Sequence, residues 1–501
     1  MEGTREFLLD KIIAWATGGS AQKNGSNTYW IYGSPGIGKT SLAHSISGRL
    51  HDQKQLAGAY FCQRDDPNLK ETRNILPTLI NKLAIIFPPF RSIVAKHLRN
   101  DPNLTPESIK ESLLHDLICS LLRHPKHTLV FVLDALDECG DARSQSGVLR
   151  ALTNAAAQAP WMRVIITSRP EVGIQRFFDH SSHLRFDLAA DRGASADLRT
   201  FAQQQFDMVA SDWHLPTPWP EKSLFNGVIS RANGLFIFIK TLVLALEDCR
   251  DPTLALVAAL QGSAGAGVTS LYGLYSGILR ARISHSHAEF RKTIGVLLAA
   301  ASYRPLCEET VAELAGVSPN LVKKWVDGLS SLLYRDEGLN GGIRARHLSI
   351  SDFFMGDKCP GDYHVDLRDA NMQLGITCLR TMLGQLRFNI CKLEDSRLAN
   401  ADIQDLQSRI ERNISDALQY SCLYWSNHLC SSAKNDDRGV WEQLRNFFEG
   451  CYPLFWIEVL SLMGMVSTSV PSLRRVILTW VKASRASAWS LLGYSNIILG
   501  H

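Results

Sequence analysis

The feature that most constrains this chain is a glycine-rich segment between an apolar run and a helical one. It reads "GSPGIGKT" at residues 33–40 and fits the pattern G-x-x-x-x-G-K-[ST]. It follows "TYWIY" and precedes "SLAHSI", so it joins a predicted strand to a helix that should begin near Lys39. A loop in this setting can wrap a phosphate group. The segment therefore predicts an α/β domain that binds phosphate.

Each position of the loop has a physical reason. Gly36 and Gly38 can take positive φ angles, which turns successive N–H groups inward and leaves no side chain in the way of phosphate oxygens. Lys39 can reach the β- and γ-phosphates, and the hydroxyl of Thr40 can ligate Mg²⁺. The helix that follows adds the positive end of its dipole. The predicted phosphate-binding residues are Gly33, Ser34, Pro35, Gly36, Ile37, Gly38, Lys39, Thr40 and Ser41.

Acidic residues follow a second apolar run. In "TLVFVLDALDECG", five apolar residues at 129–133 precede Asp134, Asp137 and Glu138. A buried parallel strand has this composition, and open α/β sheets bind ligands at the C-terminal ends of their strands. We expect Asp134 to hold Mg²⁺, and either Asp137 or Glu138 to orient and deprotonate a water molecule. A solvated acidic turn is the alternative.

A third strand end carries an arginine. In "RVIITSRPEV", residues 164–167 are predicted to form a strand, and Arg169 comes just past its end. An arginine at this place can contact a γ-phosphate and sense its loss. The alternative is a surface arginine on a turn before Pro170.

The order of patterns predicts several domains. Apolar runs alternate with helical stretches from residue 28 to about 190, which indicates a parallel sheet covered by helices. Helical spacing dominates afterwards, and the glycine-rich segment 261–270 suggests a boundary. Two extended runs around "DEGLNGG", together with nearby helices, suggest a winged helix. The predicted fold is an α/β P-loop NTPase followed by an all-α domain, a winged helix and a further helical region. Strands are expected at 28–32, 58–62, 128–133, 164–167 and 184–188.

Composition limits the classes of partner. The net charge of +4 arises from 53 basic and 49 acidic residues without a basic run, so no nucleic-acid partner is expected. The 11 cysteines form no CxxC pair, which favours reduced thiols in the cytoplasm. The most apolar late segment falls short of the ~20 apolar residues that a membrane span needs. We therefore expect a cytoplasmic protein with no membrane partner.

Together these motifs resemble the NACHT nucleoside triphosphatases of the STAND class, especially the fungal NOD-like receptor type with a nephrocystin-3-like N-terminal P-loop NTPase domain. The resemblance also rests on "GTRE", "FCQRDDPNLKETRNILPTLINKLA", "RANGLFIFIKT" and "RHLSISDFF" and covers nearly the whole chain. It implies a NACHT domain at 1–190, a first helical domain at 191–265, a winged helix at 266–360 and a C-terminal helical region at 361–501.

The resemblance also implies residue roles. Arg5 would approach the nucleotide from the N-terminal side, and Arg169 would act as the sensor. His347 matches the histidine that contacts the ADP β-phosphate in resting relatives. The chain departs from the family at Phe236, where many relatives carry a proline that lies against the adenine.

The function implied is a slow switch that uses ATP or ADP with Mg²⁺. Exchange of ADP for ATP would permit self-assembly into a homo-oligomer, and the effector and the sensed ligand stay unknown. A turnover ATPase coupled to remodelling and a nucleotide-silent scaffold are the alternatives. ATP is preferred over GTP because no N-K-x-D motif is found. Such receptors usually carry an effector module before the nucleotide domain and a repeat array after the helical region. Neither pattern is recognisable here, so the expectation is either a truncated product or a minimal form.

Overall fold

The computed structural model describes residues 5–18, 26–100, 113–121, 124–180, 183–191, 193–262, 265, 267–339, 341–395, 398–431 and 438–481. It divides into two compact units. The first contains residues 1–280 and two returning segments, 330–332 and 346–350. The second contains residues 281–329, 333–345 and 351–501. The four-domain division implied by the resemblance stays a prediction.

The first unit is built on a five-stranded parallel sheet with the order β2-β3-β4-β1-β5. Strand β4 therefore lies between β1, which precedes the glycine-rich loop, and β3, which precedes the acidic residues. All five strands were predicted, with small differences at their ends. The bounds are β1 (Thr28–Tyr32), β2 (Leu56–Phe61), β3 (Leu129–Asp134), β4 (Met162–Ser168) and β5 (Leu184–Asp187).

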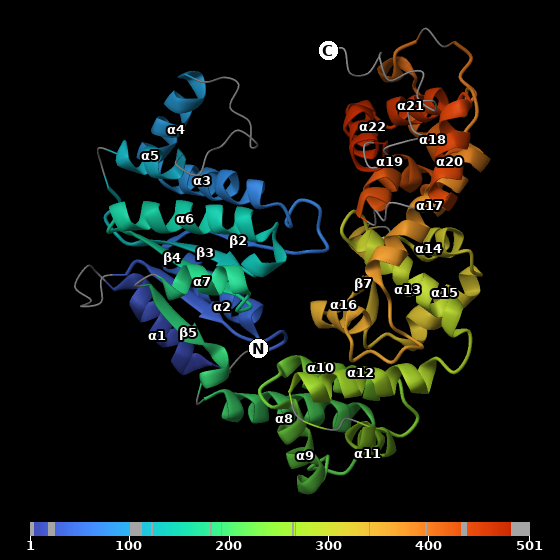
Figure 1. The fold of residues 1–501 in the computed structure, drawn as a ribbon. Coiled ribbons are helices and arrows are strands. Elements are labelled where there is room, and N and C mark those ends of the chain that lie inside the picture. Colours follow the sequence, from blue (N-terminus) through green and yellow to red (C-terminus); the bar gives the residue numbers. More distant parts are fainter. Residues whose placement is uncertain are drawn as a thin grey trace. The chain divides into compact units, whose positions relative to one another are not determined.

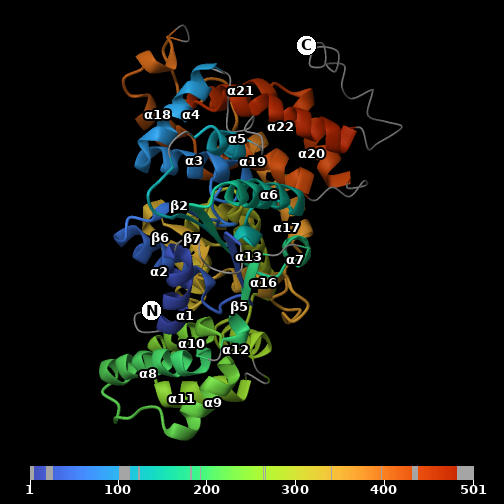
Figure 2. The same ribbon diagram turned by 90° about the vertical axis from the view of Figure 1, so that its left-hand side faces the viewer.

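Helices cover both faces of this sheet (Figures 1 and 2). One face carries α1 (Glu6–Thr17) and α2 (Lys39–Asp52). The other face carries α3 (Ile75–Ile86), α5 (Leu113–Cys119), α6 (Ala142–Gln158) and α7 (Val172–Asp179), with α4 (Pro88–Asn100) packed on α3. Helix α2 begins at Lys39, as predicted, directly after the loop.

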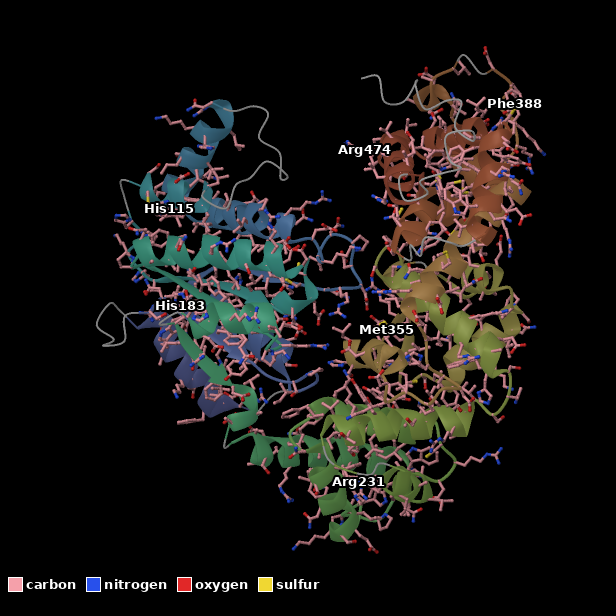
Figure 3. All side chains as sticks on the ribbon, in the orientation of Figure 1. His115, His183, Arg231, Met355, Phe388 and Arg474 are labelled. Carbon is pink, nitrogen blue, oxygen red and sulfur yellow. The ribbon has the colours of Figure 1, made fainter. Side chains whose placement is uncertain are left out.

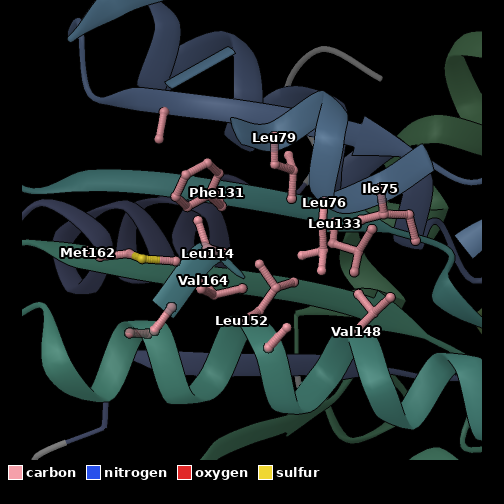
Figure 4. Close-up of a cluster of buried hydrophobic side chains, with 14 of the residues drawn as sticks. Ile75, Leu76, Leu79, Leu114, Phe131, Leu133, Val148, Leu152, Met162 and Val164 are labelled. Atoms are coloured by element: carbon pink, nitrogen blue, oxygen red, sulfur yellow. The ribbon is translucent and has the colours of Figure 1, made fainter. Parts of the chain in front are cut away.

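Alternation along the strands divides their side chains between the two faces. Trp30, Phe131 and Ile166 belong to the core cluster beneath α3, α5 and α6, part of which Figure 4 shows. Trp30 also stacks on Phe178 of α7 with ring centroids 4.6 Å apart. Strands buried on both faces are rich in Val, Ile and Leu, which is why their apolar runs are continuous in the sequence.

Trimming this core by one methylene should have a measurable cost. Ile166 is fully buried on β4, so Ile166→Val is expected to lower the free energy of unfolding by about 0.5–1.5 kcal/mol. Val172→Ala is the control, since it removes more carbon from a side chain that is 64% exposed. Urea denaturation of both variants checks this. An equal loss in the two would contradict the burial of Ile166.

From residue 193 on, the described regular structure of the first unit is helical. The helices are α8 (Ala194–Asp212), α9 (Lys222–Ala232), α10 (Phe236–Glu247), α11 (Pro252–Gly262) and α12 (Val268–Arg282). The predicted glycine-rich boundary lies between α11 and α12, and its residues 263, 264 and 266 lie outside the described residues.

The second unit begins with three helices and a hairpin, the arrangement predicted as a winged helix. These are α13 (His287–Ala301), α14 (Glu308–Ala315), α15 (Pro319–Gly328) and the antiparallel strands β6 (Leu333–Asp336) and β7 (Gly342–Ala345). Helix α16 (Leu348–Met355) starts in the first unit and continues into the second.

Among the described residues of the second unit beyond α16, the regular structure is helical. Its helices are α17 (Leu367–Gln385), α18 (Leu406–Asn413), α19 (Asp416–Ser431), α20 (Arg438–Glu449), α21 (Tyr452–Leu462) and α22 (Ser469–Val476). Trp425 and Trp456 are fully buried and meet edge to face at 5.9 Å, whereas Phe388 is 76% exposed on the surface (Figure 3). Within the described ranges, no helix has both the length and the apolar character that crossing a membrane requires.

Candidate phosphate-binding site

The glycine-rich loop has the backbone that its sequence predicts. Gly36 and Gly38 have φ angles of 77° and 96°, in the left-handed region that disfavours a side chain. A β-carbon on Gly36 would also lie 2.1 Å from Cγ2 of Ile237 on α10. Gly36 is therefore required both by its dihedral angle and by the close approach of α10.

Lys39 is buried at the start of α2. Its Nζ donates to the carbonyl oxygens of Gly33 at 2.8 Å and Ser34 at 3.0 Å. Burial lowers the pKa of Lys39 to about 8, although the negative charge of Asp137 opposes this shift. The charges of Asp134, Glu138 and Arg169 act on the same pKa, so the loop lysine and the residues from the other strand ends form one cluster.

Asp134 ends β3 and is 1% exposed. The Thr167 hydroxyl donates to the Asp134 carboxylate and accepts the N–H of Ala135 at 3.0 Å. Burial raises the pKa of Asp134, while hydrogen bonds from Thr167 and Thr40 oppose that rise. The structure thus brings together Thr40 and Asp134, the two residues predicted to hold Mg²⁺.

This pair suits Mg²⁺ when a phosphate is also present. Mg²⁺ commonly uses one or two carboxylates with substrate phosphates and water rather than a cage of protein ligands. In the part of the chain that is described, no group of three or more His, Cys, Asp or Glu side chains could hold a metal ion. A metal at Thr40 and Asp134 would therefore share its coordination with a bound phosphate.

Asp137 holds Arg169. It lies on the short 3₁₀ helix Leu136–Glu138, and its Oδ1 accepts the backbone N–H of Arg169 at 2.9 Å. The side chains also pair, with Nε of Arg169 3.3 Å from Oδ2 of Asp137, and the Asp137 side chain is 2% exposed. Both carboxylate oxygens of Asp137 are thus engaged by the arginine at the end of β4.

Glu138 has a different environment. Its Oε2 accepts the backbone N–H of Arg64 at 3.4 Å. Burial, followed by the nearby Asp137 charge, raises the pKa of Glu138 to about 7. A carboxyl group with this pKa can exchange a proton near neutral pH.

Three segments far apart in the sequence meet at residues 36 and 37. Nη2 of Arg5 donates to the carbonyl oxygen of Ile37 at 2.7 Å, and the N–H of Ile237 to that of Gly36 at 3.3 Å. His347 also lies beside the loop, because its Cε1 is 3.7 Å from where a β-carbon on Gly36 would sit. The loop is therefore contacted from three places in the first unit: from α10 by Ile237, from the residue before α1 by Arg5, and from the residue before α16 by His347.

Arg5 provides a test of whether the site suits an anion. It is 5% exposed, and burial lowers its pKa. Its guanidinium lies over the ring of Phe236 at 5.5 Å. Among the described residues, its Nε and Nη1 have no hydrogen-bond partner. Buried donors of this kind fit an anionic group beside the loop.

All the predicted site residues lie in the first unit, and their roles stay predictions. Ser34, Thr40 and Ser41 are exposed at the loop, while Ile37 and Lys39 are buried. Sequence reasoning missed Thr167, Arg64 and Ile237. Thr167 had a usable signal, since it is a polar residue at the end of an apolar strand. Arg64 acts through its backbone, and Ile237 is one apolar residue among many in its helix.

The strand arrangement, the loop after β1 and the carboxylates at the end of β3 define a P-loop NTPase domain. Residues 3–169, about a third of the chain, match the family model described as "Nephrocystin 3, N-terminal". No curated protein matches the chain.

The chain is also similar to solved structures, at low identity. Drosophila ORC bound to DNA is 14% identical, with a TM-score of 0.31, covering 70% of this chain and 85% of that one. Cdc6p from Pyrobaculum aerophilum is 13% identical, with a TM-score of 0.32, and the match covers 70% of this chain and 93% of that one. Aeropyrum pernix ORC1 in complex with DNA is 12% identical, with a TM-score of 0.31, and the match covers 71% of this chain and 93% of that one. We transfer no partner from these proteins, and the expectation that this chain binds no nucleic acid stays a prediction.

Proposed function

We propose that this chain is an ATP/ADP-binding signalling switch of the NACHT and STAND type found in fungal NOD-like receptors. One observation carries the proposal: Arg5, Ile237 and His347 come from separate segments and meet at residues 36 and 37 of the loop. A change in the bound phosphates would act on all three segments. A ligand shifts a conformational equilibrium only if it binds the two states with different affinity, and these contacts are a source of that difference.

The site residues divide between binding and slow hydrolysis. Lys39 and the loop N–H groups bind phosphate, and Thr40 and Asp134 hold Mg²⁺. When bound, the Mg²⁺-nucleotide supplies the γ-phosphoryl group for transfer to water. Glu138 accepts the proton of the attacking water, because Asp137 is occupied with Arg169. Arg169, oriented by Asp137, contacts the γ-phosphate and senses its loss.

The remaining assignments belong to the same proposal. ADP favours the resting state, and exchange for ATP permits self-assembly into a homo-oligomer in the cytoplasm. The four domains at 1–190, 191–265, 266–360 and 361–501 provide the moving parts. The effector and the sensed ligand are further partners of this switch.

Nucleotide retention tests the proposal. We expect near-stoichiometric ADP in the protein as purified, measured by denaturation and ion-exchange chromatography. Replacing His347 with Leu should speed ADP release by about 10- to 150-fold, since a hydrogen bond to a charged group contributes about 1.5–3 kcal/mol. Stopped-flow displacement of a fluorescent ADP analogue measures the rate.

His115→Leu is the control, because His115 is a partly exposed histidine of the first unit, on α5 (Figure 3). An empty site with rapid ATP turnover would support a working ATPase instead. A protein that binds neither nucleotide would support a scaffold. Unchanged ADP release in the His347→Leu variant would reject the role of His347.

A further inference from the structure

We propose that Tyr275 and Ser349 are positioning residues that set the tautomer and the orientation of His347 at the phosphate loop. This inference rests on the proposed function, because it gives His347 a defined donor for a bound phosphate. It adds Tyr275 of α12, which lies outside every sequence motif, and Ser349, which lies in the motif "RHLSISDFF" but has no role assigned there.

The hydrogen bonds at Nδ1 of His347 define the tautomer. The backbone N–H of Ser349 donates to Nδ1 at 3.1 Å. A nitrogen that accepts an N–H hydrogen bond carries no proton, so in the neutral ring the proton is on Nε2. His347 therefore presents Nε2–H as a donor.

A second layer of hydroxyl groups supports the same assignment. Oγ of Ser349 lies 2.7 Å from Nδ1 of His347. The hydroxyl of Tyr275 lies 2.8 Å from Oγ of Ser349. Because Nδ1 is an acceptor, Ser349 donates to His347 and accepts from Tyr275. The three residues thus form a directed chain from Tyr275 through Ser349 to His347.

Burial makes this direction hard to reverse. Tyr275 is 0% exposed and Ser349 is 1% exposed. A buried hydroxyl that loses its partner is left without water to replace it. Reversing either hydroxyl would place two donors or two acceptors against each other. The buried pair therefore fixes one tautomer of a half-buried histidine.

The chain of hydrogen bonds connects the loop to a particular helix. Cε1 of His347, which is bonded to both ring nitrogens, lies 3.7 Å from where a β-carbon on Gly36 would sit, so the imidazole edge is beside the loop. At the other end, Tyr275 belongs to α12 (Val268–Arg282), the helix in which the first unit gives way to the second along the sequence. A phosphate that draws Nε2–H toward the loop would thus pull on α12 through two hydroxyl groups.

A purely structural role is the alternative, because His347 precedes α16 and its side chain accepts an N–H of the first turn, as an N-cap does. If His347 only caps α16, removing the hydroxyl of Tyr275 should change neither the tautomer of His347 nor the rate of ADP release. The experiment must therefore change the hydroxyl of Tyr275 and measure both the tautomer and ADP release.

The first measurement is the tautomer. Long-range ¹H–¹⁵N correlation spectra of protein labelled with ¹⁵N-histidine distinguish Nδ1–H from Nε2–H, and the spectrum of His347→Gln identifies the His347 signals among the 15 histidines. We expect Nε2–H in the wild-type protein and a smaller excess of Nε2–H in Tyr275→Phe, where the backbone N–H of Ser349 still donates to Nδ1 but the Ser349 hydroxyl is no longer held as a second donor. Tyr29→Phe is the matched control, since it removes the hydroxyl of another buried tyrosine of the first unit. A wild-type Nδ1–H tautomer would overturn the proposal.

The second measurement is the ADP dissociation rate in a double-mutant cycle. Tyr275→Phe should speed release about threefold in the wild-type background, the size expected for one neutral hydrogen bond. It should have no further effect in the His347→Leu background. Full additivity, or a wild-type rate in Tyr275→Phe, would overturn the positioning role even if the switch stands. If the wild type binds no nucleotide, the proposed function fails, and the tautomer measurement still decides the chain of hydrogen bonds.

Discussion

Replacing Lys39 with alanine is expected to abolish nucleotide binding, with a loss of affinity of at least about 100-fold. The Lys39 ammonium group is buried, so its charge is poorly screened by water and its attraction for a phosphate is strong. Alanine would also remove the donor that bridges the carbonyl oxygens of Gly33 and Ser34. The loop would therefore lose a positive charge and the two hydrogen bonds that connect Lys39 to its backbone.

Isothermal titration with ATP and with ADP, both with Mg²⁺, measures this effect. Lys222→Ala is the control, because Lys222 is an exposed lysine at the start of α9 in the same unit. Retention of wild-type ATP affinity by Lys39→Ala would show that the nucleotide binds elsewhere. Circular dichroism of both variants separates loss of binding from loss of fold.

Replacing Glu138 with glutamine is expected to slow ATP hydrolysis by about 100- to 10,000-fold, the range attributed to a general base. Glutamine keeps the shape and the acceptor for the Arg64 N–H but takes no proton. ATP affinity should stay near wild type, since Glu138 is not among the residues that bind phosphate. Single-turnover hydrolysis and equilibrium binding, measured on the same preparation, check the two halves of this prediction.

The pH dependence gives an independent test of Glu138. Its raised pKa of about 7 means that the base is protonated below neutral pH. The hydrolysis rate should therefore rise with pH up to about 7 and then level off, and the Glu138→Gln variant should lack this rise. Asp137→Asn is the comparison: it should weaken the contact with Arg169 and, because it removes a charge that raises the pKa of Glu138, move the rise in rate to lower pH without abolishing it. A profile lost in Asp137→Asn and kept in Glu138→Gln would assign the base to Asp137.

Much of the α/β domain could be predicted from local patterns. The strands β1 to β4 are short apolar runs between helical stretches, as expected of buried strands, whereas β5 at the sheet edge has the sequence "LRFD" and is partly exposed. The loop could be predicted because its glycines and its lysine have specific mechanical roles. The strand order could not, because whether β4 pairs with β1 or with β5 depends on contacts between runs that look alike.

The partners of the site residues were harder to predict. The choice between Asp137 and Glu138 was open because neighbouring carboxylates in a turn have the same local pattern. The structure favours Glu138 as the base because Asp137 contacts Arg169, a residue about 30 positions away in the sequence. The approach of Ile237 to Gly36 and the chain from Tyr275 to His347 depend on tertiary packing, which no local motif records.

The position of β4 separates two tasks within one domain. Strand β4 is hydrogen-bonded to β1 on one side and to β3 on the other. The loop, Asp134 and Arg169 therefore lie at the ends of three adjacent strands of one sheet, which fixes their spacing. The loop is also contacted by residues that lie outside the sheet, namely Arg5, Ile237 and His347. Substitutions among these outer residues can retune how long a nucleotide stays bound while the reacting groups keep their spacing. A family of such proteins could in this way evolve different response times around one unchanged chemistry.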